Sequence, residues 1–407
     1  MSDGACYDIV IVGAGPVGLC LAASLRGAPL RIALVDRLDE ATLADPAYDG
    51  REIALTLKSV ATLRNLGLWE RLPGEQVAPL HGARVHNGTS LSCLDLHPPP
   101  AAAAQIGYLV SNHSLRRAAH EAARANTEVS WFAPRRVTQV TCSTQAARVA
   151  LENGPALEAR LVVAADSRFS ETRRALGIAA RMRDFGRTML TCRMTHELEH
   201  RCIAQEWFGH HQTLALLPLN GRCSSVILTL PHAEITRLQQ LPADGFEREL
   251  EVRSALRLGR MRLNSERFAY PLVGVYASRF VAERFAAIGD AAVGMHPVTA
   301  HGFNFGLASQ ATLAQLLRQA QHSGRAIADA TLLRRYEQAH RRTTLPLYLA
   351  TNAIARLYTD DSPPARLARG ALLHLAHRIP PIGSALSRWL IREGASAAGT
   401  SASVSRA

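Results

Sequence analysis

Residues 7–36 of the 407-residue chain read YDIVIVGAGPVGLCLAASLRGAPLRIALVD. Tyr7–Val12 is a short run rich in β-branched residues, as expected of a buried parallel strand. A glycine motif with the spacing G-x-G-x-x-G follows it, and the next stretch is rich in Ala and Leu and reads as a helix. Arg31–Val35 is a second buried strand. The stretch therefore predicts a β-α-β unit at the start of the fold.

The glycine spacing in this unit predicts a particular ligand. Gly13 permits the tight turn from strand to helix, Gly15 lets the backbone approach a pyrophosphate, and Gly18 lets the helix pack closely on the strand. The N-terminus of the helix offers free N–H groups and its positive dipole end to phosphates. Asp36 ends the second strand at about the spacing of an acid that binds ribose hydroxyls. We therefore predict a dinucleotide site here.

The composition of the whole chain is that of a globular protein. Hydrophobic residues make up 47% and charged residues 20%, so the chain can bury a large core and is not disordered. The seven cysteines are an odd number without any C-x-x-C, which argues against a disulfide framework and a thiolate zinc site. Neither a signal peptide nor a membrane-spanning run is recognisable. We expect a cytoplasmic protein.

The net charge of +12 is almost entirely due to arginine, because Lys58 is the single lysine among 46 basic residues. Two interpretations stay open: codon usage in a GC-rich genome, or attraction to an anionic surface. Nucleic acid is disfavoured because the chain has no clustered basic arm and no zinc finger. Peripheral contact with the inner membrane is compatible with the charge. Arg366–Arg392, where arginines alternate with apolar residues, could form helices that lie on a membrane or pack on the protein.

The rest of the chain predicts further elements. Thr188–Leu230 alternates as antiparallel strands do, with a hairpin turn at Asn220-Gly221. Other segments are expected to be a loop and then a helix at Tyr48–Leu68, helices at Leu115–Arg124 and Gly302–Gln321, a helical C-terminal third at Thr331–Arg392, and a disordered tail at residues 395–407. A dinucleotide domain built from separate segments, with an antiparallel sheet inserted, is the architecture that this order predicts.

A second glycine-acid pair favours FAD over NAD. Gly289-Asp290 follows the apolar strand Phe285–Ile288, and a helix is expected to begin near Gly302. An acid at a strand end is well placed for a ribityl chain, and a helix N-terminus beside a flavin stabilises its anionic reduced form. An extended FAD explains contacts from both ends of the chain.

In these motifs the chain resembles the group A FAD-dependent aromatic hydroxylases, specifically the ubiquinone-biosynthesis branch. The likeness extends from Tyr7 to about Trp389, and Met295–Asn304 is most similar to the demethoxyubiquinol hydroxylase subgroup. Its other motifs are Gly13–Gly18 with Asp36, Asp49-Gly50-Arg51, Gly107–Asn112, Val163–Asp166, Ala215–Pro218 and Gly289-Asp290. The resemblance implies an α/β fold with a Rossmann-type FAD-binding domain, an inserted antiparallel-sheet substrate domain and a helical C-terminus. The expected segments are 1–75, 103–180 and 275–335 for FAD, 76–102 and 181–274 for substrate, 336–394 for the C-terminal helices, and 395–407 for the tail.

The resemblance also implies roles for individual residues. The expected cofactor-binding residues are Gly13, Gly15 and Gly18 at the pyrophosphate, Asp36 at the ribose, Arg51, Asn112 and Asp166 along the FAD, Gly289 and Asp290 at the ribityl chain or the phosphates, and Pro297, Gly302, Phe303 and Asn304 along the isoalloxazine. Two positions depart from the family. Ser167 stands where the family has Gly, so free access to positive φ is lost. His301 stands where the family has Gln, either as a titratable group near the flavin or as a neutral substitute; it is the candidate catalytic residue.

The family's reaction uses NAD(P)H to reduce the flavin and hydroxylates an electron-rich ring with O2 through a flavin C4a-hydroperoxide, while the protein excludes water. The implied substrate is a membrane-borne polyprenylated quinol precursor. Alternatives are a hydroxylase of soluble aromatics or polyketides, an FAD-binding scaffold in a quinone-synthesis complex, and a zinc hydrolase. The candidates for the substrate side are Trp207, Phe208, Leu216 and Pro218. The alternative for each is an ordinary place in the hydrophobic core.

The zinc alternative depends on His196-Glu-Leu-Glu-His200, which matches the H-E-x-x-H motif of zinc hydrolases. That motif binds zinc through two histidines on one helix face. Here it lies between strand-like runs, so we expect a strand-turn-strand element and no metal site.

Overall fold

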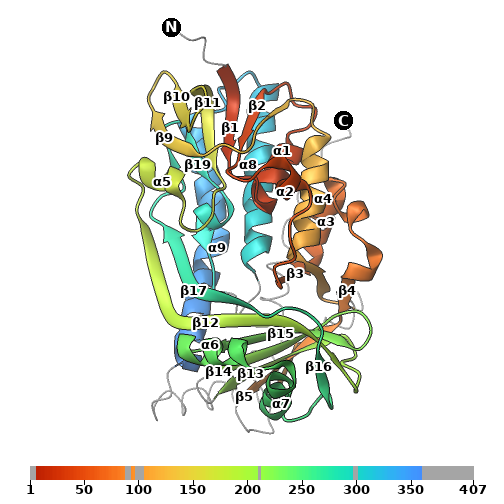
Figure 1. Ribbon diagram of the computed structural model, residues 1–407. Helices are drawn as coiled ribbons and strands as arrows, with labels where there is room; N and C mark the ends of the chain where they lie inside the picture. Colours follow the sequence, from red (N-terminus) through yellow and green to blue (C-terminus); the bar gives the residue numbers. More distant parts are fainter. Residues whose placement is uncertain (1–5, 88–92, 97–104, 210–211, 297–300, 360–407) are drawn as a thin grey trace, which may run out of the picture.

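The structure is a computed structural model that describes residues 6–87, 93–96, 105–209, 212–296 and 301–359 (Figure 1). In this part of the chain the strands form three sheets. The strands of the first sheet are β1 (Cys6–Val12), β2 (Ile32–Val35), β8 (Val129–Phe132), β9 (Val137–Cys142), β10 (Ala147–Leu151), β11 (Leu157–Ala164), β18 (Val281–Ala282) and β19 (Phe285–Ala287). Their order is β18-β19-β11-β1-β2-β8, with β10 and β9 continuing from β11.

The first sheet contains the predicted β-α-β unit. β1 pairs in parallel with β2 and with β11, and every residue of β2 is buried, because helices cover the sheet. α1 (Pro16–Ser24) packs against α4 (Asn112–Arg124) and α8 (Gly302–His322). The remaining helices around this sheet are α2 (Glu40–Ala44), α3 (Leu57–Asn65), α5 (Glu171–Ala175) and α9 (Ala330–Thr359). The β-α-β prediction is confirmed.

The second sheet is the predicted antiparallel one. Its strands are β5 (Gly82–Asn87), β6 (Cys93–Leu96), β12 (Ala180–His196), β13 (Ile203–Gly209), β14 (Gln212–Pro218), β15 (Cys223–Leu230), β16 (Met261–Leu263), β17 (Phe268–Ala277) and β20 (Val293–Gly294). The hairpin between β14 and β15 turns at Gly221, whose φ is +70°, as predicted. Two helices that the sequence analysis missed, α6 (His232–Gln240) and α7 (Ala243–Arg253), cover one face of this sheet.

A small third sheet consists of β3 (Glu52–Thr56), β7 (Gly107–Ser111) and β4 (Val77–Leu80). The expectation of a loop and then a helix over Tyr48–Leu68 is correct for α3 but wrong for the five residues before it, which form β3. β3 pairs with β7, which lies far away in the sequence. The local sequence pattern does not reveal this strand, because its hydrogen-bond partner β7 comes about 50 residues later in the chain.

Two long strands connect the first sheet to the second (Figure 1). β12 pairs with β17 over Ala180–Asp184, loses register, and pairs with it again over Thr188–Thr191. The expected domain boundary at residue 275 therefore falls inside β17, and the one at residue 335 falls inside α9. The predicted helices and tail beyond residue 359 lie outside the described residues. No helix in the described ranges is long and apolar enough to cross a membrane.

Candidate functional site

A cleft of about 720 Å³ opens where the parallel strands of the first sheet end. Its lining begins with Val12, Val35 and Ile288, which close or follow β1, β2 and β19, and extends to Met189 and Ile227 of the second sheet. Ligands of open α/β sheets bind at this edge, outside the carboxyl ends of the strands. The cleft lies between the two large sheets.

The glycine motif forms the floor of one end of the cleft. A Cβ on Gly13, whose φ is +107°, would lie 2.5 Å from the carbonyl oxygen of Ala165, and a Cβ on Gly18 would lie 2.0 Å from the oxygen of Gly13. Nothing lies within 4 Å of a Cβ placed on Gly15, which faces open space. Gly15 is also the N-cap of α1 and supplies no capping side chain. The first N–H groups of α1 are therefore available to an anion.

The side chains around the cleft match the charge of a diphosphate. Its arginines are Arg37, Arg51, Arg116, Arg135, Arg136, Arg168 and Arg174. Arg116 lies on α4, and desolvation lowers the pKa of its guanidinium. A cleft that combines open helix N–H groups with several guanidinium groups fits the diphosphate of FAD.

Asp36 occupies its predicted place at the end of β2. Its Oδ2 accepts a hydrogen bond from the Ala14 N–H at 2.7 Å, and its Oδ1 accepts one from the Leu38 N–H at 2.9 Å. These bonds fix the carboxylate against the glycine turn. Each carboxylate oxygen has further lone-pair capacity, so Asp36 can also accept hydrogen bonds from a ribose.

Arg51 and Asn112 meet at a residue that the sequence analysis quoted but did not assign to the site. The carboxylate of Asp49 accepts hydrogen bonds from Arg51 Nε at 3.0 Å and from Asn112 Nδ2 at 2.7 Å. Burial acts to raise the pKa of Asp49, but these bonds and the charge of Arg51 outweigh it and lower that pKa. The hydroxyl of Tyr270 on β17 donates to the Asp49 carbonyl at 2.7 Å. The cofactor side and the substrate sheet are thus joined here.

The middle motif keeps the turn that its missing glycine put in doubt. Asp166 Oδ2 accepts hydrogen bonds from the N–H and hydroxyl of Thr172, and Ser167 adopts a φ of +98°. The turn therefore requires a positive φ, and serine accepts it at some cost in strain. Arg168, which follows, donates to Asp290 Oδ2 at 3.0 Å. No motif in the sequence had marked Arg168 as part of the site.

Around the start of α8, some of the expected cofactor-binding residues line the cleft and one of them has a structural role instead. Gly302 and Phe303 line the cleft, and His301 is the N-cap residue just before them. Asn304 instead holds β3: its Nδ2 donates to the Ala54 carbonyl at 2.8 Å and its Oδ1 accepts from the Thr56 N–H at 3.1 Å. Gly289, with a φ of +57°, places Asp290 at the cleft. Pro297 lies outside the described residues.

The substrate side of the cleft is mostly apolar. Met189, Leu217 and Ile227 of the second sheet line it together with Ile53 and Ala54 of β3. Four residues were candidates for the substrate side. Two of them, Trp207 and Leu216, pack in the core beneath α6 and α7, so for these two the alternative that they are core residues is correct. Pro218 follows Leu216 by two residues and shares its face, whereas Phe208 is on the other face with Ala204. The sequence alone does not show which residues of a strand point to which face of the sheet.

The H-E-x-x-H segment is a strand end followed by a turn, as predicted. His196 ends β12, and its ring nitrogens bond to the Leu198 carbonyl at 2.7 Å and the Ser224 hydroxyl at 3.0 Å. His200 donates to the Leu219 carbonyl at 2.8 Å and accepts from the Cys202 N–H. Both rings are therefore committed to the protein. Within the described ranges no three His, Cys, Asp or Glu side chains are grouped as metal ligands.

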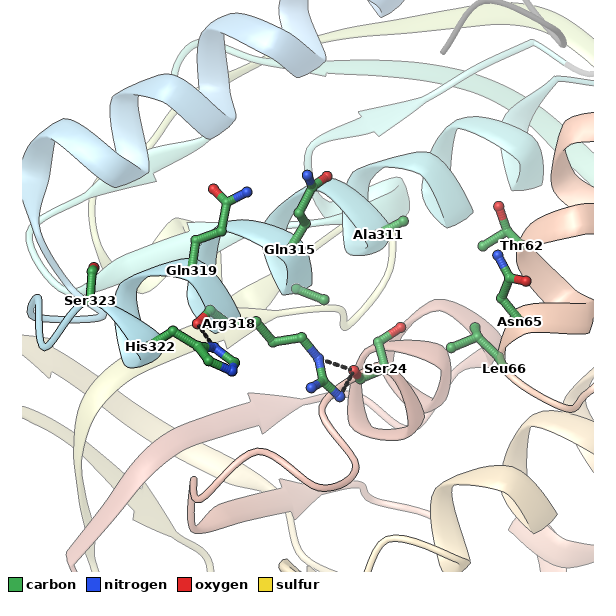
Figure 2. A pocket seen from close by; sticks show the side chains of 11 residues that line it. Ser24, Thr62, Asn65, Leu66, Ala311, Gln315, Arg318, Gln319, His322 and Ser323 are labelled. Carbon is green, nitrogen blue, oxygen red and sulfur yellow. Dashed lines mark hydrogen bonds between the residues drawn. The ribbon is translucent and has the colours of Figure 1, made fainter. Parts of the chain in front are cut away.

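A second pocket of about 690 Å³ lies between α1, α3 and α8 (Figure 2). Arg318 crosses it and donates two hydrogen bonds to the carbonyl of Ser24. None of the expected cofactor residues lines this pocket. Its arginine serves to fix α8 to the end of α1.

Comparisons with known proteins show the family to which the chain belongs. The FAD binding domain family matches residues 6–345. The ubiquinone hydroxylase UbiM of Neisseria meningitidis is 43% identical over 94% of this chain and 84% of its own length. UbiL of Rhodospirillum rubrum, also a ubiquinone hydroxylase, is 36% identical (92% and 87%), and the 3-demethoxyubiquinol 3-hydroxylase of Escherichia coli is 24% identical (91% and 95%).

Among solved structures, p-nitrophenol 4-monooxygenase PnpA of Pseudomonas putida has a TM-score of 0.74 at 17% identity, covering 95% of this chain and 99% of its own. This likeness shows the fold, and the α/β architecture with an inserted antiparallel sheet is confirmed. The family match and the two ubiquinone hydroxylases above 30% identity go further. The chain belongs to the FAD-dependent ubiquinone hydroxylase family of flavin monooxygenases.

Proposed function

We propose that this protein uses NAD(P)H and O2 to hydroxylate the ring of a polyprenylated quinol precursor of ubiquinone, of the demethoxyubiquinol type. The observation that carries the proposal is the apolar wall formed by Met189, Leu217 and Ile227 at the substrate side of the cofactor cleft. An electron-rich, lipid-linked ring has little need of ionic contacts, and such a wall buries it and excludes water.

The residues of the chain have separate tasks in this reaction. Bound FAD supplies the redox chemistry, by taking electrons from the nicotinamide and activating O2. Gly15 and the open end of α1 would hold its diphosphate, and Asp36 its ribose. Asp290, oriented by Arg168, would hold the ribityl chain. Gly302 and Phe303 would lie beside the flavin ring.

Purified holoprotein tests the proposal directly. A short-chain quinol that lacks one ring oxygen should stimulate NAD(P)H oxidation, and the product should gain one oxygen atom by mass spectrometry. Deletion of the gene in its own host should lead to a prenylated ring that lacks one or more oxygens. Turnover of soluble phenols with no response to any quinol would instead favour the alternative, a hydroxylase of soluble aromatic substrates.

Peripheral contact with the inner membrane is part of the same proposal. Its support is the net charge of +12 together with a substrate that resides in the bilayer. Sedimentation with vesicles would test it: binding to vesicles with anionic lipid that weakens at high salt is expected. Equal binding to neutral vesicles would contradict an electrostatic contact.

A further inference from the structure

A row of paired residues leads across the second sheet from the cofactor cleft to a carboxylic acid. Thr191 on β12 pairs with Ile227 on β15, Ile227 pairs with Ala215 on β14, and Ala215 pairs with Glu206 on β13. Directly paired residues of antiparallel strands share a face. Thr191 and Ile227 line the cleft, so Glu206 projects from the cleft face, roughly 10 Å along the row from Ile227 at the usual strand spacing.

The apolar wall of the cleft continues to this position. The opposite face of the sheet is closed by α6 and α7. Ala204, which precedes Glu206 by two residues and shares its face, is buried in a cluster with Ala54 and Leu217, both of which line the cleft. Glu206 is not itself one of the residues that line the cleft; it lies just beyond them on the same face of the sheet.

The carboxyl of Glu206 has no partner among the described residues. It makes no hydrogen bond or ion pair there. Its neighbours in the row and on its own strand are Val85, Ala215, Ala204 and Phe208, none of which titrates. α9 also contacts β13, and Thr351–Ala355 near its end carry no titratable side chain. Burial alone raises the pKa of Glu206 to about 8. The side chain is nevertheless only partly buried. Carboxyl groups inside proteins usually have hydrogen-bond partners, and this partly buried one, which has none among the described residues, is left available to a ligand.

We infer that Glu206 is a catalytic base that contacts a ring hydroxyl of the substrate. The hydroxyl O–H bond breaks and an O–H bond forms on a Glu206 carboxylate oxygen. The electron pair left on the ring oxygen raises the electron density at the ortho and para carbons, where the ring accepts oxygen. After hydroxylation the ring carbon loses its C–H proton, and Glu206 returns its proton to the ring oxygen. The inference rests on the proposed function, because it requires a hydroxylated ring.

The apolar surroundings suit this task. A phenol has a pKa near 10, and an unperturbed glutamate has one near 4.3. An ordinary carboxylate would have to remove the proton against a difference of about six pKa units, whereas Glu206 faces about two. Proton transfer is then roughly 10⁴-fold less unfavourable, and the base remains partly ionised near neutral pH.

Glu206→Gln tests the inference, because glutamine keeps the shape and cannot accept the proton. Glu199→Gln, at an exposed position of the same domain, is the matched control. We expect the rate of quinol hydroxylation by wild type to rise with pH around 8. We expect Glu206→Gln to lower that rate by about 10²-fold or more and to abolish the rise. FAD content and NAD(P)H oxidation without substrate should stay near wild type.

The outcomes separate the two proposals. Wild-type hydroxylation rates and an unchanged pH profile in Glu206→Gln would overturn the role of Glu206 and leave the proposed function intact. A wild-type protein that binds FAD and oxidises NAD(P)H but hydroxylates no quinol or phenol analogue would overturn the proposed function, and the base with it. A loss shared equally by Glu199→Gln would also overturn the specific role.

Discussion

Arg168 donates a hydrogen bond from its guanidinium to Oδ2 of Asp290 at 3.0 Å, although the two residues are 122 positions apart in the chain. Arg168 follows β11 and Asp290 follows β19, and these two strands are neighbours in the first sheet. Both side chains line the cofactor cleft. The pair therefore ties together two loops that FAD would contact.

Arg168→Met should weaken FAD binding. The substitution leaves Asp290 as an unpaired negative charge beside the expected cofactor, which is itself anionic, and we expect a loss of affinity of about tenfold, or ~1.4 kcal/mol. Flavin fluorescence titration of the apoprotein measures it. Adding Asp290→Asn should recover part of the affinity, since it removes the stranded charge. Equal affinities for wild type and Arg168→Met would contradict this account.

Ser167→Gly should stabilise the protein. Serine at a φ of +98° is strained by about 1–3 kcal/mol, and glycine relieves part of this while making the unfolded chain more flexible. A rise in the melting temperature of the apoprotein is the expected result. Asn153→Gly is the matched control, because Asn153 has a φ of +50°, which asparagine tolerates. A larger rise of the melting temperature in Asn153→Gly than in Ser167→Gly would contradict the idea that Ser167 is strained.

Alanine substitutions should affect Gly15, which is expected to contact the cofactor, and Gly18, which packs within the fold, in different ways. Gly15→Ala places its methyl group in open space, so the apoprotein should melt as wild type does but bind FAD at least about tenfold more weakly, because the backbone no longer approaches the diphosphate. Gly18→Ala would collide with the Gly13 carbonyl and should reduce soluble expression. Melting curves and FAD titrations of both variants check this contrast.

Arg193 and Glu52 form an ion pair at 2.6 Å in which the Glu52 side chain is 1% exposed. Arg193→Met should destabilise the protein by about 3–5 kcal/mol, because it strands a buried carboxylate. Burial already raises the pKa of Glu52, and losing Arg193 raises it further, so the deficit should shrink as the pH falls and Glu52 binds a proton. The double variant Arg193→Met with Glu52→Gln should recover much of the lost free energy of unfolding, as measured by chemical denaturation.

Glu206 should make the stability of the protein depend on pH. Its pKa is raised by burial from 4.5 to about 8 in the folded state. Between these values the folded protein binds the proton more tightly than the unfolded chain, so stability falls as the pH rises. Glu206→Gln should therefore melt above wild type at about pH 9 and show no gain at about pH 4. A constant difference at both pH values would contradict the shift.

The parts of the site that sequence alone predicted are local ones. The turn at Gly13–Gly18 and Asp36 belong to one β-α-β unit, whose backbone conformation is determined by neighbouring residues. Ser167 was recognisable as a difficult position because its turn needs a positive φ, which the structure has.

What the sequence could not predict depends on pairing between distant strands. The partner of Asp290 became apparent only once β11 and β19 lay side by side. Trp207 was proposed for the substrate side but faces α6 and α7, because the direction of a strand's side chains depends on register. Glu206, its neighbour, projects from the opposite face, which also carries Ile227, for the same reason, and nothing in its local sequence distinguishes it from a surface acid.

The interruption in the pairing of β12 determines which of its later side chains point toward the cofactor cleft. Phe185–Arg187 lie opposite a single residue of β17, between two stretches of regular pairing. Inserting or deleting one residue there would turn Met189 and Thr191 away from the flavin and bring Leu190 and Cys192 toward it. Sequence variation among relatives should therefore change side chains in these three positions and preserve their number. Chimaeras that exchange the substrate sheet should be joined with this segment intact.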